Sequence, residues 1–245
     1  MIRSFVIDSL PERAAQYRST HALVVVDVFR ASTVIVTALA GGHPVYPVGT
    51  LAEALNTAGR LREPLLAGEQ AGIKPDLFDF DNSPVALEAV PGRNPVVLLT
   101  SAGTLLLTNC RGASAIFVAC LRNFSATARV LEHHRRVALI GAGTRGKPRD
   151  EDQLVCAWIG DQLLAAGFRP EDERTSDEIA YWRDVNPAVL REGPSADFLR
   201  ASGQEQDLAW VLAHIDDLEA VAVYNGQQVN LLPANARHPL AADAT

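Results

Sequence analysis

The amino-acid sequence predicts a three-layer α/β/α fold, with helices covering both faces of a largely parallel or mixed sheet. Two observations support this fold class. Short β-branched runs alternate with stretches of helical periodicity through the first two-thirds of the 245-residue chain. Strands that alternate with helices need crossover connections, which make neighbouring strands parallel and cover both faces of their sheet. A chain of this length can form one large domain or two closely packed lobes.

The predicted strands are short apolar runs bounded by turn residues. They cover residues 5–7, 23–28, 44–48, 64–67, 95–99, 115–118, 137–140 and 221–224. Ligands of open α/β sheets bind in the loops that follow the carboxyl ends of the strands. We therefore expect functional residues in the loops after residues 26, 67, 99, 118 and 140.

Three predicted helices have recognisable ends. Thr50 and Glu53 form a capping box that predicts a helix through residue 61. Asn123 is expected to cap a helix that reaches residue 132. The clearest helix spans about residues 150–166, with acids in its first turn and Gly167 directly after it.

We interpret residues 1–233 as a single domain. Crowded charges and prolines between about residues 169 and 202 predict a helical excursion at its periphery. Residues 234–245 are expected to form a mobile tail.

Composition and charge narrow the functional classes. The net charge of −7 argues against non-specific nucleic-acid binding but allows a small anionic ligand in a locally basic site. No apolar run approaches the roughly 20 residues of a membrane span, and the start of the chain lacks a signal-peptide pattern. The three cysteines have no metal-binding spacing and are expected to be buried. We expect a soluble, cytoplasmic protein, with a homo-oligomer such as a dimer as the default.

The first candidate site follows the strand at 23–28. Asp27 lies near the carboxyl end of this strand and is suited to bind a hard cation. Arg30 can bind two phosphate oxygens at once, and the hydroxyls of Ser32 and Thr33 could add to an anion site at a helix start. An Asp–Arg pair with Ser32 as a helix cap is the open alternative.

Two other turns carry polar residues after predicted strands. Glu69 follows a glycine that allows close approach of a ligand, and Asn82 lies in a turn that could equally be a plain helix cap. Ser101, Gly103 and Thr104 form a turn that could present hydroxyl and N–H groups to an oxyanion. A simple capped turn is the alternative there too.

The sequence at 141–146 matches GxGxxG after a strand, but Lys147-Pro148-Arg149 delays the following helix. A dinucleotide site is therefore disfavoured. The acids at 150–152 are more suggestive. They could favour the helix dipole and nothing more, or Glu151 and Asp152 could reach a metal beside a phosphate.

In this order the motifs resemble the 2-phosphosulfolactate phosphatase family, the Mg²⁺-dependent phosphatases of coenzyme M biosynthesis. The matching features are Val-Val-Asp-Val-Phe-Arg-Ala-Ser-Thr at 25–33, Leu-Leu-Ala-Gly-Glu at 65–69, Phe-Asp-Phe-Asp-Asn-Ser-Pro at 78–84, the turn at 99–104, Gly-Ala-Gly-Thr at 141–144, Glu151-Asp152 and Asp207. The resemblance covers about residues 3–225. It implies an α/β fold and hydrolysis of a phosphate monoester that carries a carboxylate and a sulfonate, giving sulfolactate and phosphate. The residues at matching positions are Asp27, Arg30, Glu69, Asn82, Ser101, Thr104, Glu151 and Asp152.

Two positions depart from the family pattern. The family usually has Thr-Asn-Gly-Thr where this chain has Ser-Ala-Gly-Thr at 101–104, so Ala102 replaces an amide. It usually has Gly-Asn-Ser-Pro where this chain begins with Asp81. Losing a polar contact and adding a carboxylate near an anion site should alter substrate preference.

The predicted mechanism is phosphoryl transfer from a small anionic phosphorylated substrate. Some of Asp27, Glu69, Glu151 and Asp152 would hold Mg²⁺, while Arg30 and the 101–104 turn hold the phosphate. In-line attack by water and an aspartyl-phosphate on Asp27 are both open. Candidates for binding a second anionic group are Arg122, Arg145, Lys147 and Arg149. A phosphatase for a different phosphorylated acid and a non-catalytic binder of a phosphorylated metabolite are the alternatives.

Overall fold

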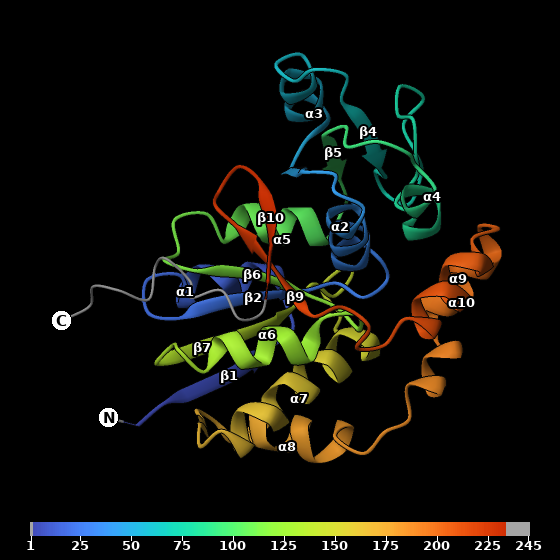
Figure 1. Ribbon diagram of the computed structural model, residues 1–245. Helices are drawn as coiled ribbons and strands as arrows, with labels where there is room; N and C mark the ends of the chain where they lie inside the picture. Colours follow the sequence, from blue (N-terminus) through green and yellow to red (C-terminus); the bar gives the residue numbers. More distant parts are fainter. Residues whose placement is uncertain (1, 234–245) are drawn as a thin grey trace.

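The computed structural model describes residues 2–233, so the predicted mobile tail at 234–245 lies outside the described residues. Strands and helices alternate along the chain (Figure 1). The strands are β1 Ser4–Asp8, β2 Ala22–Val26, β3 Val45–Val48, β4 Leu65–Gly68, β5 Val96–Leu99, β6 Ile116–Ala119, β7 Arg136–Gly141, β8 Arg169–Pro170, β9 Ala220–Tyr224 and β10 Val229–Pro233. The helices are α1 Ala14–Tyr17, α2 Ala31–Ala40, α3 Leu51–Ala58, α4 Pro84–Glu88, α5 Gly103–Asn109, α6 Phe124–Leu131, α7 Asp150–Ala165, α8 Glu173–Trp182, α9 Pro194–Ala201 and α10 Glu205–Ala213, with short 3-10 helices η1 Pro11–Arg13 and η2 Pro187–Arg191.

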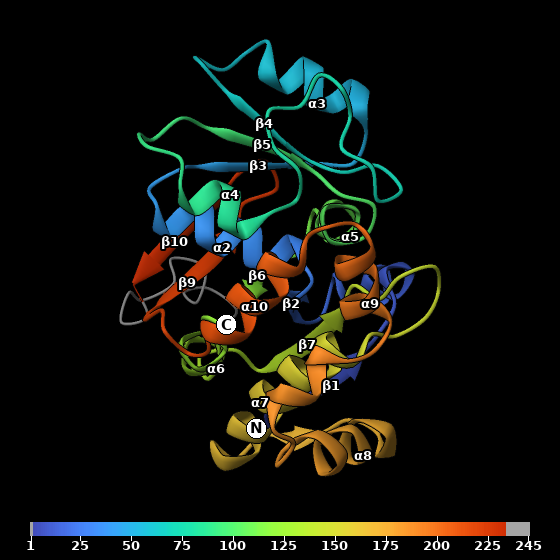
Figure 2. The ribbon, with the colours of Figure 1, turned by 90° about the vertical axis from the view of Figure 1, so that its right-hand side faces the viewer.

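The strands form one mixed sheet in the order β4-β5-β3-β10-β9-β6-β2-β7-β1-β8. β4, β5 and β3 are parallel to one another, and β6, β2, β7, β1 and β8 form a second parallel block. The antiparallel pair β9–β10 joins the two blocks, and β10 meets β3 through the pair Val229–Val45. Figure 2 shows the smaller block with α3 at the top of the molecule and the larger block below it. The predicted α/β/α class with a mixed sheet is confirmed.

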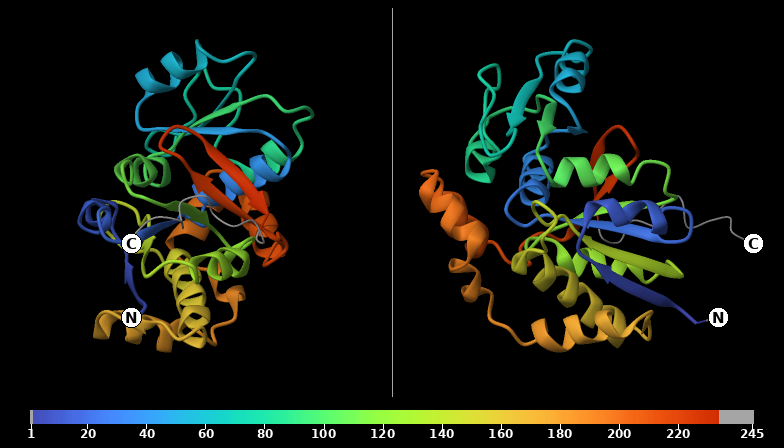
Figure 3. Two further views of the ribbon diagram at one scale, coloured as in Figure 1. Left: turned by 60° about the vertical axis from the view of Figure 1, so that its left-hand side comes forward. Right: turned by 180° about the vertical axis from the view of Figure 1, so that it is seen from behind.

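Strand β2 shows how the sequence builds the layers. Val24 and Val26 belong to the core cluster that includes α6 and α7, whereas Leu23 and Val25 belong to the cluster that includes α2 and α5. All four side chains are fully buried. Because successive side chains of a strand point to opposite faces, a continuous apolar run is what a strand covered on both faces requires. Figure 3 shows helices on either side of the sheet.

Several local expectations are confirmed and one is wrong. Thr50 caps α3 by accepting a hydrogen bond from the Glu53 N–H at 3.1 Å, and Gly167 follows α7 with a φ of +88°. The Asn123 side chain does not cap α6. Its Oδ1 instead accepts the Cys120 N–H at 3.0 Å, because the loop after β6 folds back over that amide.

The sequence patterns predict neither strand β8 nor strand β10. β8 has only two residues, and β10 follows β9 after a short turn. Strand β2 ends at Val26, before the predicted residue 28, and so releases Asp27 from the sheet. The three cysteines are buried and unpaired, as expected.

The helices after α7 pack against two different parts of the molecule. α8 packs against α7 and β1, whereas α10 packs against both α4 and α9 (Figures 1 and 3). The second pair therefore reaches the loops that follow β4. Within residues 2–233, none of the helices is both long and apolar enough to cross a membrane.

Candidate active site

A cavity of about 540 Å³ lies where the loops after β2, β4, β5 and β7 meet helix α9. Its lining residues are Asp27, Phe29, Arg30, Glu69, Ala71, Gly72, Asn82, Thr100, Ser101, Ala102, Gly143, Thr144, Arg145, Arg149, Glu151, Asp152, Pro194, Ser195, Phe198 and Leu199. The cavity thus occupies the carboxyl ends of strands from both parallel blocks, the place where open α/β sheets bind ligands. Nine of the predicted site residues line it: Asp27, Arg30, Glu69, Asn82, Ser101, Arg145, Arg149, Glu151 and Asp152.

The turn from β2 into α2 is held by its own hydroxyl groups. Ser32 Oγ accepts the Asp27 N–H at 3.0 Å, and Thr33 Oγ1 donates to the Val28 carbonyl at 2.8 Å. The Ala31 N–H donates to Asp27 Oδ1 at 3.2 Å. Ser32 and Thr33 are buried and do not line the cavity, so they shape the turn that presents the Asp27 carboxylate.

The turn from β5 into α5 packs directly on Asp27. A Cβ atom added to Gly103 would lie 2.5 Å from Asp27 Oδ2 and 2.5 Å from the Ala31 Cβ, so only glycine fits there. Thr104 is fully buried, and its Oγ1 accepts the Thr100 N–H at 2.8 Å and donates to the Thr100 carbonyl at 2.9 Å. Gly103 and Thr104 therefore place the turn against Asp27 without lining the cavity themselves.

Glu69 ties the loop after β4 to the loop after β5. Its Oε1 accepts the Ser101 N–H at 2.6 Å, and its Oε2 accepts the Ser101 Oγ hydroxyl at 2.9 Å and the Gly72 N–H at 2.6 Å. Ser101 Oγ in turn accepts the Ala71 N–H at 2.8 Å. Both carboxylate oxygens of this half-buried side chain are thus committed to fixing the loops.

The first turn of α7 carries two buried carboxyl groups into the cavity. Asp152 Oδ1 accepts the Val28 N–H at 2.9 Å and its Oδ2 accepts the Gly143 N–H at 3.2 Å, which joins the loops after β2 and β7. Glu151 Oε1 accepts the Ser195 hydroxyl at 2.5 Å. Ser195 belongs to α9, in the segment that the sequence assigns to the periphery.

Three buried carboxyl groups, those of Asp27, Asp152 and Glu151, have raised pKa values. Burial raises the pKa of Asp27 to about 7, with the negative charges of Glu151 and Glu69 adding to the effect and the Ala31 N–H and Arg30 opposing it. Burial also raises the pKa of Asp152 well above its ordinary value, helped by the charges of Asp27 and Glu151. For Glu151 burial again raises the pKa, against the Ser195 hydrogen bond. Three like charges brought together in a buried site favour protonation or a bound cation.

The carboxylate oxygens of this cluster are of the kind that Mg²⁺ prefers as ligands. Among residues 2–233, no three His, Cys, Asp or Glu side chains are arranged to hold a metal ion by themselves. Mg²⁺ needs only one or two protein carboxylates, because it keeps several waters and takes substrate oxygens. Hydrogen bonds from the described residues reach Asp27 only at Oδ1, which leaves Asp27 Oδ2 available as a ligand. Glu151 Oε1 accepts the Ser195 hydroxyl, and the Glu151 carboxyl also accepts a backbone N–H.

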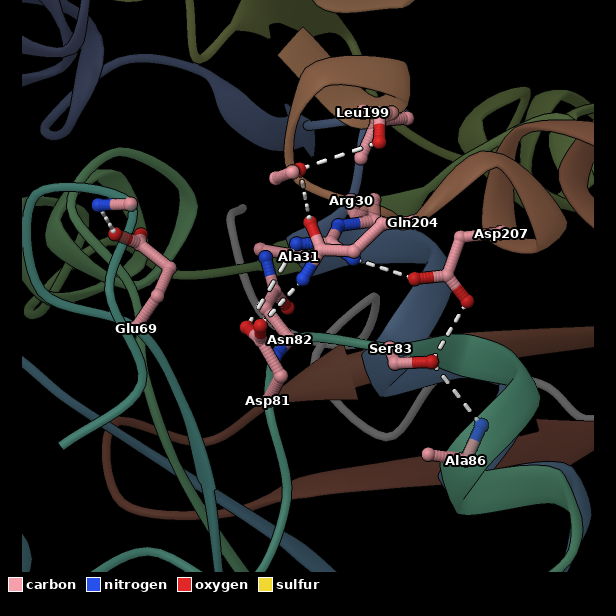
Figure 4. Close-up of polar contacts among 12 residues, drawn as sticks. Arg30, Ala31, Glu69, Asp81, Asn82, Ser83, Ala86, Leu199, Gln204 and Asp207 are labelled. Carbon is pink, nitrogen blue, oxygen red and sulfur yellow. Dashed lines mark hydrogen bonds and ion pairs between the residues drawn. The ribbon is translucent and has the colours of Figure 1, made fainter. Parts of the chain in front are cut away.

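Arg30 also lines the cavity and lies in a network of ion pairs (Figure 4). Its Nη1 donates to Asp207 Oδ2, and its Nη2 lies 3.7 Å from Asp81 Oδ1. Ser83 Oγ donates to the second Asp207 oxygen at 2.6 Å. Next to Asp81, the buried Asn82 Oδ1 has no hydrogen-bond partner among the described residues.

The remaining arginines divide into two kinds. Arg145 and Arg149 line the cavity from the loop before α7, and the buried Nε of Arg149 has no acceptor within residues 2–233. Arg122 lies elsewhere: its Nε and Nη2 donate to Asp217 at 3.0 and 2.8 Å, and its Nη1 donates to Thr37 at 3.2 Å. The structure therefore does not bring Arg122 to the site.

Sequence reasoning missed Ser195 and the other α9 residues that line the cavity. The local sequence signals only a helix start, because Gly193 precedes Pro194 at the first helical position. No local pattern predicts that this helix lines a cavity whose other residues all come from the first 152 positions.

An α/β fold with a cluster of acids and unpaired arginines at its strand ends defines an enzyme-like site for a small anionic ligand. The sequence model of the 2-phosphosulpholactate phosphatase family matches residues 8–227. This chain belongs to that family, and it is accordingly a phosphoric monoester hydrolase.

Curated relatives agree with this assignment. A probable 2-phosphosulfolactate phosphatase of Clostridium perfringens (strain 13 / Type A) is 38% identical over 197 residues, which are 76% of this chain and 79% of the relative. One from Clostridium botulinum (strain Alaska E43 / Type E3) is 34% identical over 84% of this chain and 90% of its own length. A third, from Synechococcus sp. (strain RCC307), is 32% identical over 86% and 92%.

Proposed function

We propose that this phosphatase is Mg²⁺-dependent and hydrolyses the phosphate monoester of a small, multiply anionic acid, with 2-phosphosulfolactate as the substrate and sulfolactate and phosphate as products. The names of the relatives support the substrate. The observation that carries the proposal is the cluster of buried Asp27, Glu151 and Asp152, with raised pKa values, in one cavity with the unpaired Arg145 and Arg149.

Asp27 and Glu151 are the residues that would hold the ion. Bound there, Mg²⁺ would neutralise charge on the phosphate and activate a water for attack. Asp152 and Glu69 act as positioning residues, because every one of their carboxylate oxygens already accepts a hydrogen bond that fixes a loop. Their charges also keep the site acidic enough to attract a divalent cation.

The other cavity residues orient the substrate and exclude water. Arg145 and Arg149 supply guanidinium groups for the phosphate and for a second acidic group. Phe198 and Leu199 cover the cavity from α9 and lower its exposure to solvent. Position and charge neutralisation are the main demands of phosphoryl transfer, and this set of residues meets both.

Phosphate release from a panel of small phosphorylated acids, in Mg²⁺ and in EDTA, tests the proposal. We expect release from 2-phosphosulfolactate that requires Mg²⁺. Asp27→Asn should lower kcat at least about a thousandfold, since it removes both a ligand and a charge at the reacting centre. Asp177→Asn, on the exposed face of α8, is the matched control and should keep full activity.

Three results would count against the proposal. Substantial turnover by the Asp27→Asn variant would remove the central role of Asp27. Release that persists in EDTA would exclude the metal requirement. Release from no compound by a folded, Mg²⁺-loaded protein would leave a binder of a phosphorylated metabolite. Acid quenching during turnover, followed by a search for phosphate bound to Asp27, separates an aspartyl-phosphate from direct attack by water.

A further inference from the structure

Asp81 places a carboxylate next to the arginine that a phosphate would be expected to use. Its Oδ1 lies 3.7 Å from Arg30 Nη2, while its Oδ2 accepts a hydrogen bond from the Gln204 side chain (Figure 4). The Asp81 side chain is 27% exposed, whereas that of Arg30 is only 4% exposed. Asp81 is therefore the more accessible partner of the buried guanidinium.

Arg30 already shares its charge with a second carboxylate. Asp207 is buried and accepts the Arg30 Nη1 hydrogen bond, and Ser83 holds its other oxygen. When all three groups are ionised, Arg30, Asp81 and Asp207 carry one net negative charge. A substrate anion that approaches Arg30 consequently meets a region that repels it.

The positive charge outside ion pairs comes from the loop between β7 and α7. Of the three arginines among the described residues that line the cavity, Arg145 and Arg149 are in no ion pair, and Arg149 has a buried N–H without an acceptor. Beside Asp81, the buried Asn82 Oδ1 is an acceptor without a donor. A buried polar atom without a partner is costly, so each of these atoms points to a ligand group of the opposite kind.

Arg145 and Arg149 thus offer cations and an N–H for an anion, whereas Asn82 offers an acceptor for an uncharged donor such as a hydroxyl group or a water. We propose that Asp81 is a specificity-determining residue, whose carboxylate weakens the binding of negative charge next to Arg30 and Asn82. This inference rests on the proposed phosphatase function and adds the charge preference of the same site.

Asp81 also helps to hold the turn after α9 in place, and this structural effect has to be separated from the effect of its charge. Through Gln204 it is bonded to the turn that follows α9, and α9 covers the cavity with Phe198 and Leu199. Loss of Asp81 could thus act by moving α9 and not by changing the electrostatics. Gln204→Ala breaks this contact but leaves the carboxylate beside Arg30, so it isolates the mechanical contribution.

The test uses two phosphate esters that differ only by one sulfonate group: 2-phospholactate, and its analogue with a sulfonate on carbon 3. We compare the kcat/KM of the sulfonated ester with that of the unsulfonated ester. In Asp81→Asn this ratio should rise about tenfold because the KM of the sulfonated ester falls, as expected for removal of one nearby like charge. Asp76→Asn is the control: it removes the same charge from an exposed position of the same loop. An unchanged ratio in Asp81→Asn would overturn the proposal, as would an equal rise in Asp76→Asn or Gln204→Ala.

A second readout does not depend on turnover. Calorimetric titration with inorganic sulfate measures anion binding by the same variants, with circular dichroism to check their fold. We expect Asp81→Asn to bind sulfate about tenfold more tightly than the unmodified protein, and Asp76→Asn and Gln204→Ala to bind it unchanged. If neither ester is hydrolysed but this order holds, the proposed function fails and the role of Asp81 stands. Equal sulfate affinity in all four proteins would refute the role of Asp81 whatever the turnover.

Discussion

Asp27 is the residue whose environment alters its chemistry most. A strand-end aspartate exposed to water would be ionised at neutral pH, but burial raises the pKa of Asp27 from 3.8 to about 7. Glu151 and Glu69 add to the shift, and both lie far from Asp27 in the sequence, Glu151 in α7 and Glu69 in the loop after β4. The position of the carboxylate is visible in the sequence, whereas its raised pKa comes from neighbours that only the fold supplies.

This raised pKa predicts a specific dependence of stability on pH. The folded protein holds more protons than the unfolded chain between pH 3.8 and about 7, so the contribution of Asp27 to stability is fully present below pH 3.8 and is lost as the pH rises through about 7. In EDTA, the free energy of unfolding should fall between pH 5 and pH 8 more steeply for the unmodified protein than for Asp27→Asn. The difference between the two pH values should be at most about 3 kcal/mol. Urea denaturation at the two pH values measures it, and parallel slopes for the two proteins would contradict the assigned burial.

At the scale of elements, the site depends on how closely two turns approach each other. The β5–α5 turn packs on Asp27 through Gly103, where a Cβ atom would be 2.5 Å from the carboxylate. Gly103→Ala should therefore destabilise the protein by about 1–3 kcal/mol and reduce phosphate release, because the turn has to move away from Asp27. Gly59→Ala is the matched control, since its Cβ atom would only make an ordinary 3.5 Å contact with the Leu55 carbonyl. Urea denaturation of both variants provides the measurement, and similar unfolding energies for the two would argue against this packing.

Helix α9 contributes through the Ser195 hydroxyl. This group donates to Glu151 and counteracts the rise in its pKa, so Ser195→Ala should raise that pKa further. Because a proton then competes more strongly for Glu151, Mg²⁺ affinity at pH 6.5 should fall about tenfold and recover at pH 8.5. Calorimetry at both pH values checks this expectation, with Ser195→Thr as the rescue variant and Ser176→Ala on α8 as the control. A loss of affinity that is the same at both pH values would indicate a packing defect instead.

At the scale of the whole molecule, the site lies across two parallel blocks of one sheet. β10 joins the smaller block through the pair Val229–Val45, and one buried core cluster contains side chains of both blocks. Glu69 and Ser101 come from the smaller block, and Asp27, Glu151 and Asp152 from the larger one.

A ligand held in the cavity should consequently stabilise the entire fold. After treatment with EDTA, added Mg²⁺ should raise the melting temperature, by an amount equivalent to about 2.7 kcal/mol at a hundred times Kd. Asp27→Asn should lose this response, and KCl at matched ionic strength should not produce it. Differential scanning calorimetry makes the comparison; an equal rise with KCl would show a general salt effect instead of a bound ion.

The sequence by itself determined the fold class and most of the chemistry. Alternating apolar runs and helical periodicity predict the layered α/β fold, because hydrophobic patterning acts locally. Asp27, Glu69, Glu151 and Asp152 are recognisable from the sequence because each lies at or near a strand end or helix start. Their order along the chain also carries the resemblance to the family that the comparisons support.

Only the tertiary structure decided which of these residues face one another. The antiparallel β9–β10 pair, the cover formed by α9, the pairing of Arg122 with Asp217 and that of Asp81 with Arg30 and Gln204 all join positions distant in the sequence. Local patterns carry no information on such contacts, because hydrogen bonds and ion pairs depend on distances of a few ångströms that are set when the elements pack. The raised pKa values and the polarity of the cavity arise at that level for the same reason.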